Sequence, residues 1–151
     1  MKITPHIRWM IRSDTPAVLD IENLCFSDPW PEEEFLDWLR ERNVIGMVAE
    51  YDGKVVAYMV YQLHKASIEL VNMAVQPRCQ RLGVGTAMID KLKGKLHAQR
   101  RSKLRFCIKE TNLDGQLFLR AMGMKCVRIE DRDGETGYTF DYHTTSVLVT
   151  S

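Results

Sequence analysis

The chain has 151 residues, of which 45% are hydrophobic and 27% charged, with 21 lysines and arginines against 20 aspartates and glutamates. This length is typical of one domain, so the sequence predicts a single domain over residues 1–151. The near-zero net charge gives no bulk electrostatic reason to expect nucleic-acid binding, and the ordinary apolar fraction excludes a disordered chain. No apolar run reaches the roughly 18 residues that a membrane span needs.

The cysteines are scattered along the chain as Cys25, Cys79, Cys107 and Cys126. They form no CxxC pair, and no histidine lies near them at the spacing of a zinc site. The N-terminal stretch Met1–Asp14 lacks the apolar segment of a signal peptide. We therefore expect reduced thiols, no bound metal, no membrane partner and a cytoplasmic protein.

The first forty residues show one strand pattern and two helix patterns. Alternating apolar and polar residues predict a strand over residues 6–12. Ser13 or Asp14 is a suitable cap for a following helix, with Pro16 in its first turn. A second helix is expected from about Pro31, where three glutamates fall at the positive end of the helix dipole.

The rest of the chain alternates between strands and helices. Strands over 44–51 and 54–63 form a hairpin around Asp52-Gly53, a strong two-residue turn signal. A strand over 67–75, a helix over 83–99, a strand over 104–108 and a helix over 113–122 follow, and Gly123 ends the last of these. Two strands, near 124–130 and 138–149, complete the chain. The order βααβββαβαββ predicts an α/β (α+β) fold with a mixed central sheet flanked by helices.

The segment Gln80–Thr86 joins the strand over 67–75 to the next helix and contains Gly83 and Gly85. Glycines let a backbone approach a ligand closely, and the N–H groups at a helix start favour a phosphate. The segment is neither a Walker loop, since Gly-Lys-Ser/Thr is missing, nor a dinucleotide motif, since Met88 replaces the third glycine. Taken alone, the two glycines fit an ordinary tight turn equally well.

The motif Gln80-Arg81-Leu82-Gly83-Val84-Gly85 resembles the Gln/Arg-x-x-Gly-x-Gly/Ala signature of the GCN5-related N-acetyltransferase (GNAT) superfamily. Leu70–Val75 is similar to the strand that precedes this signature, and the order of elements matches the GNAT fold over nearly the whole chain. Two further segments, Phe26–Phe35 and Lys109–Asn112, resemble the RimI branch, bacterial enzymes that acetylate the N-terminal amine of a ribosomal protein.

The resemblance implies acetyl-CoA as cosubstrate and direct transfer of its acetyl group to a primary amine. The implied cofactor contacts are Met73, Ala74 and Val75 for the pantetheine arm, Arg81, Leu82, Gly83, Val84, Gly85 and Thr86 for the pyrophosphate, and Asn112 for the arm. The implied acceptor is a protein N-terminal α-amine, such as that of a basic ribosomal protein. A small polyamine or aminoglycoside, or a CoA-binding module without turnover, remain alternatives.

The chain departs from the RimI pattern at both proton-transfer positions. Cys107 stands where the glutamate base is expected, and Leu119 stands where the tyrosine acid is expected. Burial statistics predict that Cys107 is a buried strand residue.

Replacement catalytic residues are found elsewhere in the chain. Glu69 corresponds to the catalytic glutamate of histone-type members of the superfamily, and by strand alternation it shares a face with Val71 and Met73. A strand-end glutamate in solvent is the competing interpretation. Tyr138, or Tyr142, is the candidate acid, against an ordinary core or rim tyrosine. The histidines at 64, 97 and 143 show no partner spacing and are expected on the surface.

The absence of the expected glutamate base and tyrosine acid favours an acceptor that loses its proton easily. Deprotonating an α-amine at pH 7 costs about 1 kcal/mol, against about 4.6 kcal/mol for a lysine. Acidic residues of the second helix are expected beside the acceptor groove, where they would steer a cationic amine toward the thioester. These residues are Glu32, Glu33, Glu34, Asp37 and Glu41.

Overall fold

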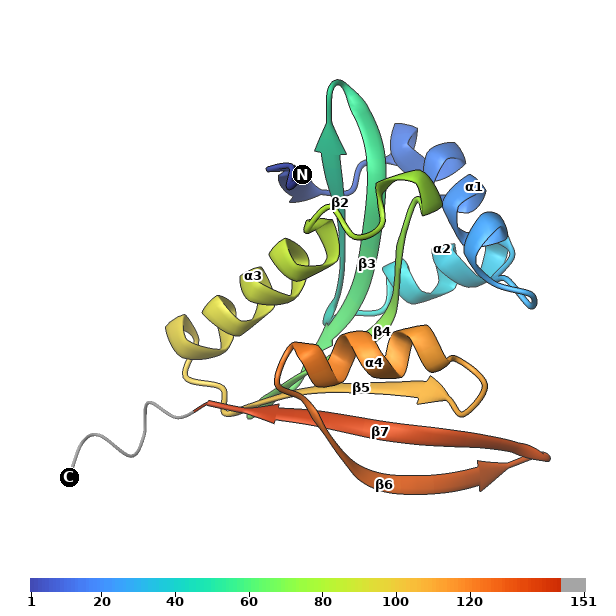
Figure 1. Ribbon diagram of the computed structural model, residues 1–151. Helices are drawn as coiled ribbons and strands as arrows, with labels where there is room; N and C mark the ends of the chain where they lie inside the picture. The colour runs from blue at the N-terminus through green and yellow to red at the C-terminus, as the bar shows by residue number, and fades with distance from the viewer. Residues whose placement is uncertain (145–151) are drawn as a thin grey trace. The chain divides into compact units, whose positions relative to one another are not determined.

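The computed structural model describes residues 1–144, and its strands form one seven-stranded sheet in the order β1-β2-β3-β4-β5-β7-β6 (Figure 1). The strands are β1 (His6–Trp9), β2 (Val44–Tyr51), β3 (Lys54–Leu63), β4 (Ser67–Val75), β5 (Lys103–Lys109), β6 (Lys125–Arg132) and β7 (Glu135–His143). The helices are α1 (Thr15–Cys25), α2 (Glu32–Arg40), α3 (Val84–Ala98) and α4 (Leu113–Ala121), with short 3-10 turns over Arg12–Asp14 and Pro77–Cys79. The predicted order of strands and helices is confirmed.

Two tight turns account for most of the agreement in strand boundaries. Asp52 and Gly53 have φ angles of 55° and 75°, and Asp133 and Gly134 have φ angles of 51° and 82°. Two successive left-handed residues are the conformation that a two-residue hairpin requires. The first strand is shorter than predicted because the chain turns at Arg12–Asp14. Residues 145–149 of the last predicted strand lie outside the described residues.

The chain divides into two compact units. The first comprises Met1–Leu63 and Val71–Asp90, and the second comprises His64–Leu70 and the chain from Lys91 onward. The boundary therefore falls within β4 and within α3. That residues 1–151 act as a single domain stays a prediction.

The first unit has a core between its helices and one face of its strands. Val18 and Ile21 of α1, Phe35 of α2, and Val48 and Tyr58 of β2 and β3 are almost fully buried together. The phenylalanine and tyrosine rings meet edge to face, with centroids 5.5 Å apart, a favoured aromatic geometry. These contacts fix α1 and α2 on the sheet.

The strands of the second unit have two different faces. Leu104 and Phe140 are buried on the face that also holds Leu119 of α4. The opposite face carries the intervening residues of β5, and there Cys107 and Lys109 are exposed. Because side chains alternate along a strand, one sheet thus presents an apolar face to α4 and a polar face to solvent.

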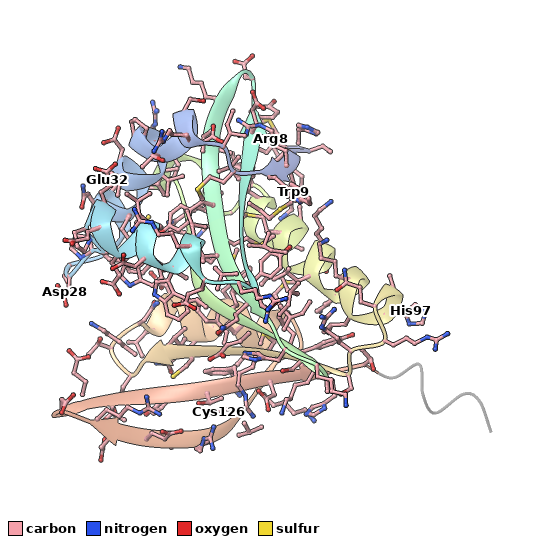
Figure 2. The ribbon with its side chains drawn as sticks, turned by 180° about the vertical axis from the view of Figure 1, so that it is seen from behind. Arg8, Trp9, Asp28, Glu32, His97 and Cys126 are labelled. Atoms are coloured by element: carbon pink, nitrogen blue, oxygen red, sulfur yellow. The ribbon has the colours of Figure 1, made fainter. Side chains whose placement is uncertain are left out.

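A buried ion pair fixes the start of α1 in the first unit. The Arg8 guanidinium (Figure 2) donates two hydrogen bonds to the Asp14 carboxylate, at 2.8 and 2.9 Å. The Ile11 N–H donates a third, at 2.8 Å, and Asp14 is only 6% exposed. Hydrogen bonding to Arg8 lowers the pKa of Asp14, so the ionised carboxylate stabilises the fold.

We expect Asp14→Asn to lower the free energy of unfolding by about 2 kcal/mol at neutral pH, the usual worth of a hydrogen-bonded charge. Because the folded-state pKa is lowered, this contribution is fully present above the unfolded pKa of about 3.9 and is lost as pH falls through the folded pKa. Urea unfolding of both proteins at about pH 7 and about pH 3 measures the difference. A difference that is the same at both pH values would contradict the assignment.

Candidate functional site

The start of α3 offers unpaired backbone donors in the first unit. Within residues 1–144, the N–H groups of Gly83, Val84, Gly85 and Thr86 have no protein acceptor at hydrogen-bond distance. Gly83 has a φ of 90°, a left-handed conformation that favours glycine. The N–H groups at a helix start together with the helix dipole suit a phosphate group. The start of α3 therefore has the backbone conformation that an anion-binding loop needs, and anion binding there stays a prediction.

The second half of β4 has an open edge. Parallel pairing between β4 and β5 ends at Leu70 and Phe106, although β4 continues to Val75. Beyond that point the Met73 N–H donates a hydrogen bond to the side chain of its neighbour, Asn72 Oδ1, at 2.9 Å. An open strand edge accepts an extended chain of amide groups as an added strand.

One side chain from α1 and one from the loop before α3 hold the end of β4. The Val75 carbonyl accepts hydrogen bonds from Cys25 Sγ at 3.3 Å and from Gln80 Nε2 at 3.1 Å. Strand edge and anion loop thus follow one another without an intervening flexible linker. Their combination fits a ligand that has both a pyrophosphate and an amide-bearing arm, which is the composition of CoA.

Asn112 has a structural role in the second unit. Its Oδ1 accepts a hydrogen bond from the Gly115 N–H at 2.9 Å, which caps the start of α4. Its predicted contact with the cofactor arm stays a prediction.

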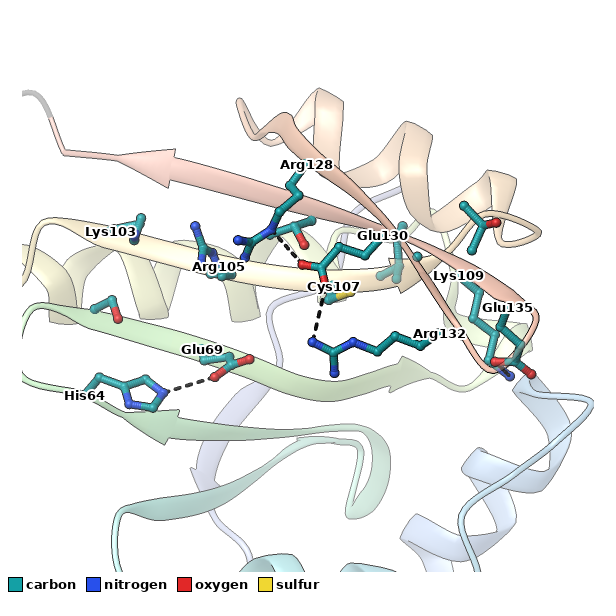
Figure 3. A pocket seen from close by; sticks show the side chains of 15 residues that line it. His64, Glu69, Lys103, Arg105, Cys107, Lys109, Arg128, Glu130, Arg132 and Glu135 are labelled. Atoms are coloured by element: carbon teal, nitrogen blue, oxygen red, sulfur yellow. Dashed lines mark hydrogen bonds and ion pairs between the residues drawn. The ribbon is translucent and has the colours of Figure 1, made fainter.

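The polar face of the second unit is hollowed into a groove of about 420 Å³ (Figure 3). Glu69, Arg105 and Cys107 lie along its floor, contributed by β4 and β5. Glu130 of β6 forms ion pairs with two arginines. Arg128 Nε lies 2.7 Å from its carboxylate, and Arg132 Nη2 lies 3.2 Å from it. The groove therefore contains both a candidate base and several fixed cations.

Glu69, the predicted base, lies in this groove and is half exposed. Its Oε1 is 3.0 Å from His64 Nε2, and it is the direct neighbour of Arg105 in the strand register. Arg105 is itself committed to Asp141, with two hydrogen bonds of 2.7 and 2.8 Å, which raise the pKa of Arg105 and lower the pKa of Asp141.

The pairing of Glu69 with His64 was missed by the sequence analysis, which expected an unpartnered surface histidine. The two residues flank the short connection between β3 and β4, where the His64 N–H also donates to the Ser67 carbonyl at 2.9 Å. The signal was the three-residue spacing between two predicted strands, which forces a tight reversal. That reversal brings position 64 alongside position 69.

The expectation that Cys107 is buried is wrong. The residue is exposed on the groove side of β5, because the helix packs on the other face of this strand. Gly137 of β7 lies beside it, and a Cβ at that position would be 3.3 Å from the Cys107 Sγ. The glycine thus leaves room around the thiol.

Tyr138, the predicted acid, is not brought together with Glu69. It pairs in register with Ile108, whereas Thr139 pairs with Cys107. Paired residues share a face, so Tyr138 lies on the α4 side of the sheet and Glu69 on the groove side. The Tyr138 hydroxyl is 3.4 Å from Glu110, and partial burial with this carboxylate raises its pKa. Tyr138 and Glu69 therefore lie on opposite faces of the sheet.

Two acidic residues of α2, Glu34 and Asp37, line a second depression, in the first unit. A groove of about 340 Å³ is lined by Glu34, Asp37, Trp38, Glu41 and Gln62. Partial burial and the neighbouring carboxylates raise the pKa of Glu34. Glu32 of α2 and Asp28 of the preceding segment are exposed at the surface (Figure 2).

A model of the acetyltransferase (GNAT) family matches residues 15–124. The chain belongs to this family. Its fold is similar to the crystal structure of the ribosomal-protein-S18-alanine N-acetyltransferase of Escherichia coli, with a TM-score of 0.82 and 23% identity over 93% of this chain and 94% of that one. The GNAT fold predicted from the signature is thus confirmed.

Two relatives in sequence share a shorter region. An uncharacterised N-acetyltransferase of Methanocaldococcus jannaschii is 34% identical over 87 residues, which cover 57% of this chain and 55% of the relative. The bS18-alanine N-acetyltransferase of E. coli is 32% identical over 80 residues, or 53% of each protein. The matched region thus spans about half the length of these curated relatives.

Three further observations concern residues 1–144 only. All four cysteines are free thiols. No group of three or more histidine, cysteine, aspartate or glutamate side chains in this part of the chain is placed to hold a metal ion. None of the helices described there combines the length and apolar character needed to cross a membrane.

Thiol alkylation tests the corrected position of Cys107. We expect iodoacetamide to modify Cys107 and Cys126, both exposed, at least about tenfold faster than Cys25, because reactivity follows exposure and thiolate fraction. Cys25 is half-buried and burial raises its pKa. Peptide mapping by mass spectrometry at short labelling times gives the order. Slow labelling of Cys107 in the folded protein would show that the groove is covered.

Proposed function

We propose that this protein is an acetyl-CoA-dependent N-acetyltransferase. The proposal rests on one observation in this member of the GNAT family. Over Met73–Thr86, an open strand edge of β4 is followed by a loop with unpaired N–H groups and by the start of a helix. The N–H groups from Arg81 to Thr86 would hold the pyrophosphate, and Met73–Val75 would pair with the pantetheine arm. We also propose that Asn112 contacts the pantetheine arm.

The proposed acceptor is a protein N-terminal α-amine, as in the RimI branch. Support comes from the similarity to the bS18-alanine N-acetyltransferase and from the small cost of deprotonating an α-amine at neutral pH. We place the acceptor against the RimI-like segment Phe26–Phe35 and the carboxylates of α2, which favour a basic N-terminus such as that of a ribosomal protein. A cytoplasmic location belongs to the same proposal.

In the proposed reaction the neutral amine attacks the thioester carbonyl carbon, the C–N bond forms and the C–S bond breaks. Glu69 accepts the proton that the amine loses, directly or through one water, since a general base must reach that proton by a hydrogen bond. The CoA thiolate leaves and takes a proton from solvent. Tyr138 is not assigned as the acid, because it lies on the other face of the sheet from Glu69.

A CoA-binding module without turnover is the second candidate function. It is favoured by Cys107 and Leu119, which replace the expected base and acid, and Leu119 is only 1% exposed. A panel of N-terminal peptides, polyamines and aminoglycosides, followed by release of the CoA thiol, distinguishes the candidates. Turnover of any amine excludes the inert module, and the preferred amine identifies the acceptor class.

Gly85→Glu tests the anion loop. We expect it to abolish CoA binding in isothermal titration calorimetry, because a carboxylate would occupy the place of the pyrophosphate and repel it. Gly94→Glu is the matched control, since Gly94 is exposed on the same helix and a Cβ at that position would meet no atom within 4 Å. Retained binding in Gly85→Glu, or equal loss in both variants, would rule out this site.

Glu69→Gln tests the base. The substitution keeps the shape of the side chain but removes the proton acceptor, so we expect turnover to fall by roughly 10²–10³ while CoA affinity stays unchanged. Glu135→Gln, at the other end of the same groove and exposed, is the control for a change of charge.

A loss below about threefold, with an unchanged pH profile, would show that the amine loses its proton to water, which the low α-amine pKa permits. Intact mass after incubation with acetyl-CoA alone excludes a covalent route. A stable acetyl adduct on Cys107 would overturn direct attack.

A further inference from the structure

Glu22 is a buried carboxylate near the end of α1. It is 2% exposed, and it is not part of the groove that contains Glu69. Within residues 1–144, no lysine, arginine or histidine lies at ion-pair distance from it. A buried charge without a cation must be held by hydrogen bonds.

Three hydrogen bonds reach this carboxylate from three separate segments of the first unit. The Trp30 N–H donates to Oε2 at 2.8 Å. Asn72 Nδ2 donates to Oε1 at 2.9 Å, and the Tyr58 hydroxyl donates to the same oxygen. Burial and this contact raise the pKa of Tyr58, which keeps the phenol as a donor.

Each end of this network leads to a different part of the first unit. Asn72 also accepts the hydrogen bond from the Met73 N–H on the open edge of β4. Trp30 lies in the segment between α1 and α2, and its ring stacks on Trp38 with centroids 6.0 Å apart and planes 6° apart. Glu22 is therefore the direct link between the strand edge and the α1–α2 segment.

A purely structural role explains the carboxylate poorly. An apolar side chain of the same volume at a buried position is often neutral or stabilising relative to a buried charge. What an apolar side chain cannot do is accept an N–H from an irregular segment, which has no backbone partner for it. Segment Phe26–Pro31 contains two prolines and no regular structure, so the contact to Trp30 fixes its path.

We infer that Glu22 is a positioning residue, which holds segment Phe26–Pro31 in a fixed position relative to the open edge of β4. The inference rests on the proposed function, in which this segment lies on the acceptor side and the strand edge on the cofactor side. Glu22 touches neither reactant. It sets the geometry in which the amine meets the thioester.

The test compares Glu22→Met, which keeps the volume and accepts no N–H, with Glu22→Gln, which retains one carbonyl acceptor. We expect Glu22→Met to raise the acceptor KM by roughly tenfold or more, the equivalent of one hydrogen bond to a charged group. The acetyl-CoA KM and CoA affinity stay within about threefold of wild type, which is within the context-dependent range of such a contact. Glu22→Gln should restore most of the acceptor affinity.

Amide hydrogen exchange gives a readout that needs no acceptor. We expect the Trp30 N–H to be protected in wild type and to exchange about tenfold faster or more in Glu22→Met, because its acceptor is gone. Tyr58→Phe is the matched control, since it removes a different donor from the same carboxylate. It should lower stability without changing Trp30 exchange or acceptor KM.

The outcomes separate the two proposals. Unchanged Trp30 exchange in Glu22→Met, or an acceptor KM that moves equally in Tyr58→Phe, overturns the positioning role. If Glu22→Met does not fold, hydrogen exchange of the wild type and of Glu22→Asp gives the answer. An unprotected Trp30 N–H in the wild type overturns the inference. Loss of this protection in Glu22→Asp, whose shorter side chain cannot reach Trp30, supports it. Failure of the wild-type protein to bind CoA refutes the proposed function and leaves the exchange result standing.

Discussion

The end of pairing between β4 and β5 is the constraint on which the site depends. While the two strands pair, up to Leu70 and Phe106, the backbone groups between them are satisfied by each other. Beyond that point β4 continues as a strand with an open edge, which would be a liability for an ordinary sheet. The Met73 N–H donates to the side chain of Asn72. An edge protected so lightly, followed by a helix start with unpaired donors, is suited to a ligand with an extended amide chain.

The second unit shows how one strand serves stability and chemistry at once. Every other residue of β5 packs toward α4, and the residues between them line a groove rich in paired charges. Most of these charges are held by partners within the same face, as in the contact of Arg105 with Asp141. A groove built in this way stays polar while most of its charges are paired, and it keeps Glu69 among groups whose positions are fixed.

Local signals allowed most of the fold to be predicted from the sequence. Asp52-Gly53 and Asp133-Gly134 define their hairpins because few other dipeptides adopt two left-handed conformations. The glycines of the segment Gln80–Thr86 fitted an ordinary tight turn equally well, and the anion loop was predicted from the resemblance of this segment to the GNAT signature. The pattern of apolar and polar residues did not predict which face of a strand is covered by a helix. Cys107 was therefore misplaced, because its environment depends on the packing of α4 on one side of the sheet and not on its own neighbours in the chain.

The same distinction explains why the cofactor side and the proton-transfer side of the family signature differ in this chain. Backbone N–H groups and a strand edge bind through atoms that every residue carries, so such a site tolerates changes of side chain as long as the conformation persists. A general base depends on one carboxylate at one position, and Cys107 cannot replace it there. An acceptor amine that loses its proton at a cost of about 1 kcal/mol needs little help from the protein. A chain can therefore keep a backbone-defined site while the side chains at its proton-transfer positions change. In this chain Glu69, the proposed base, faces the same groove as Cys107.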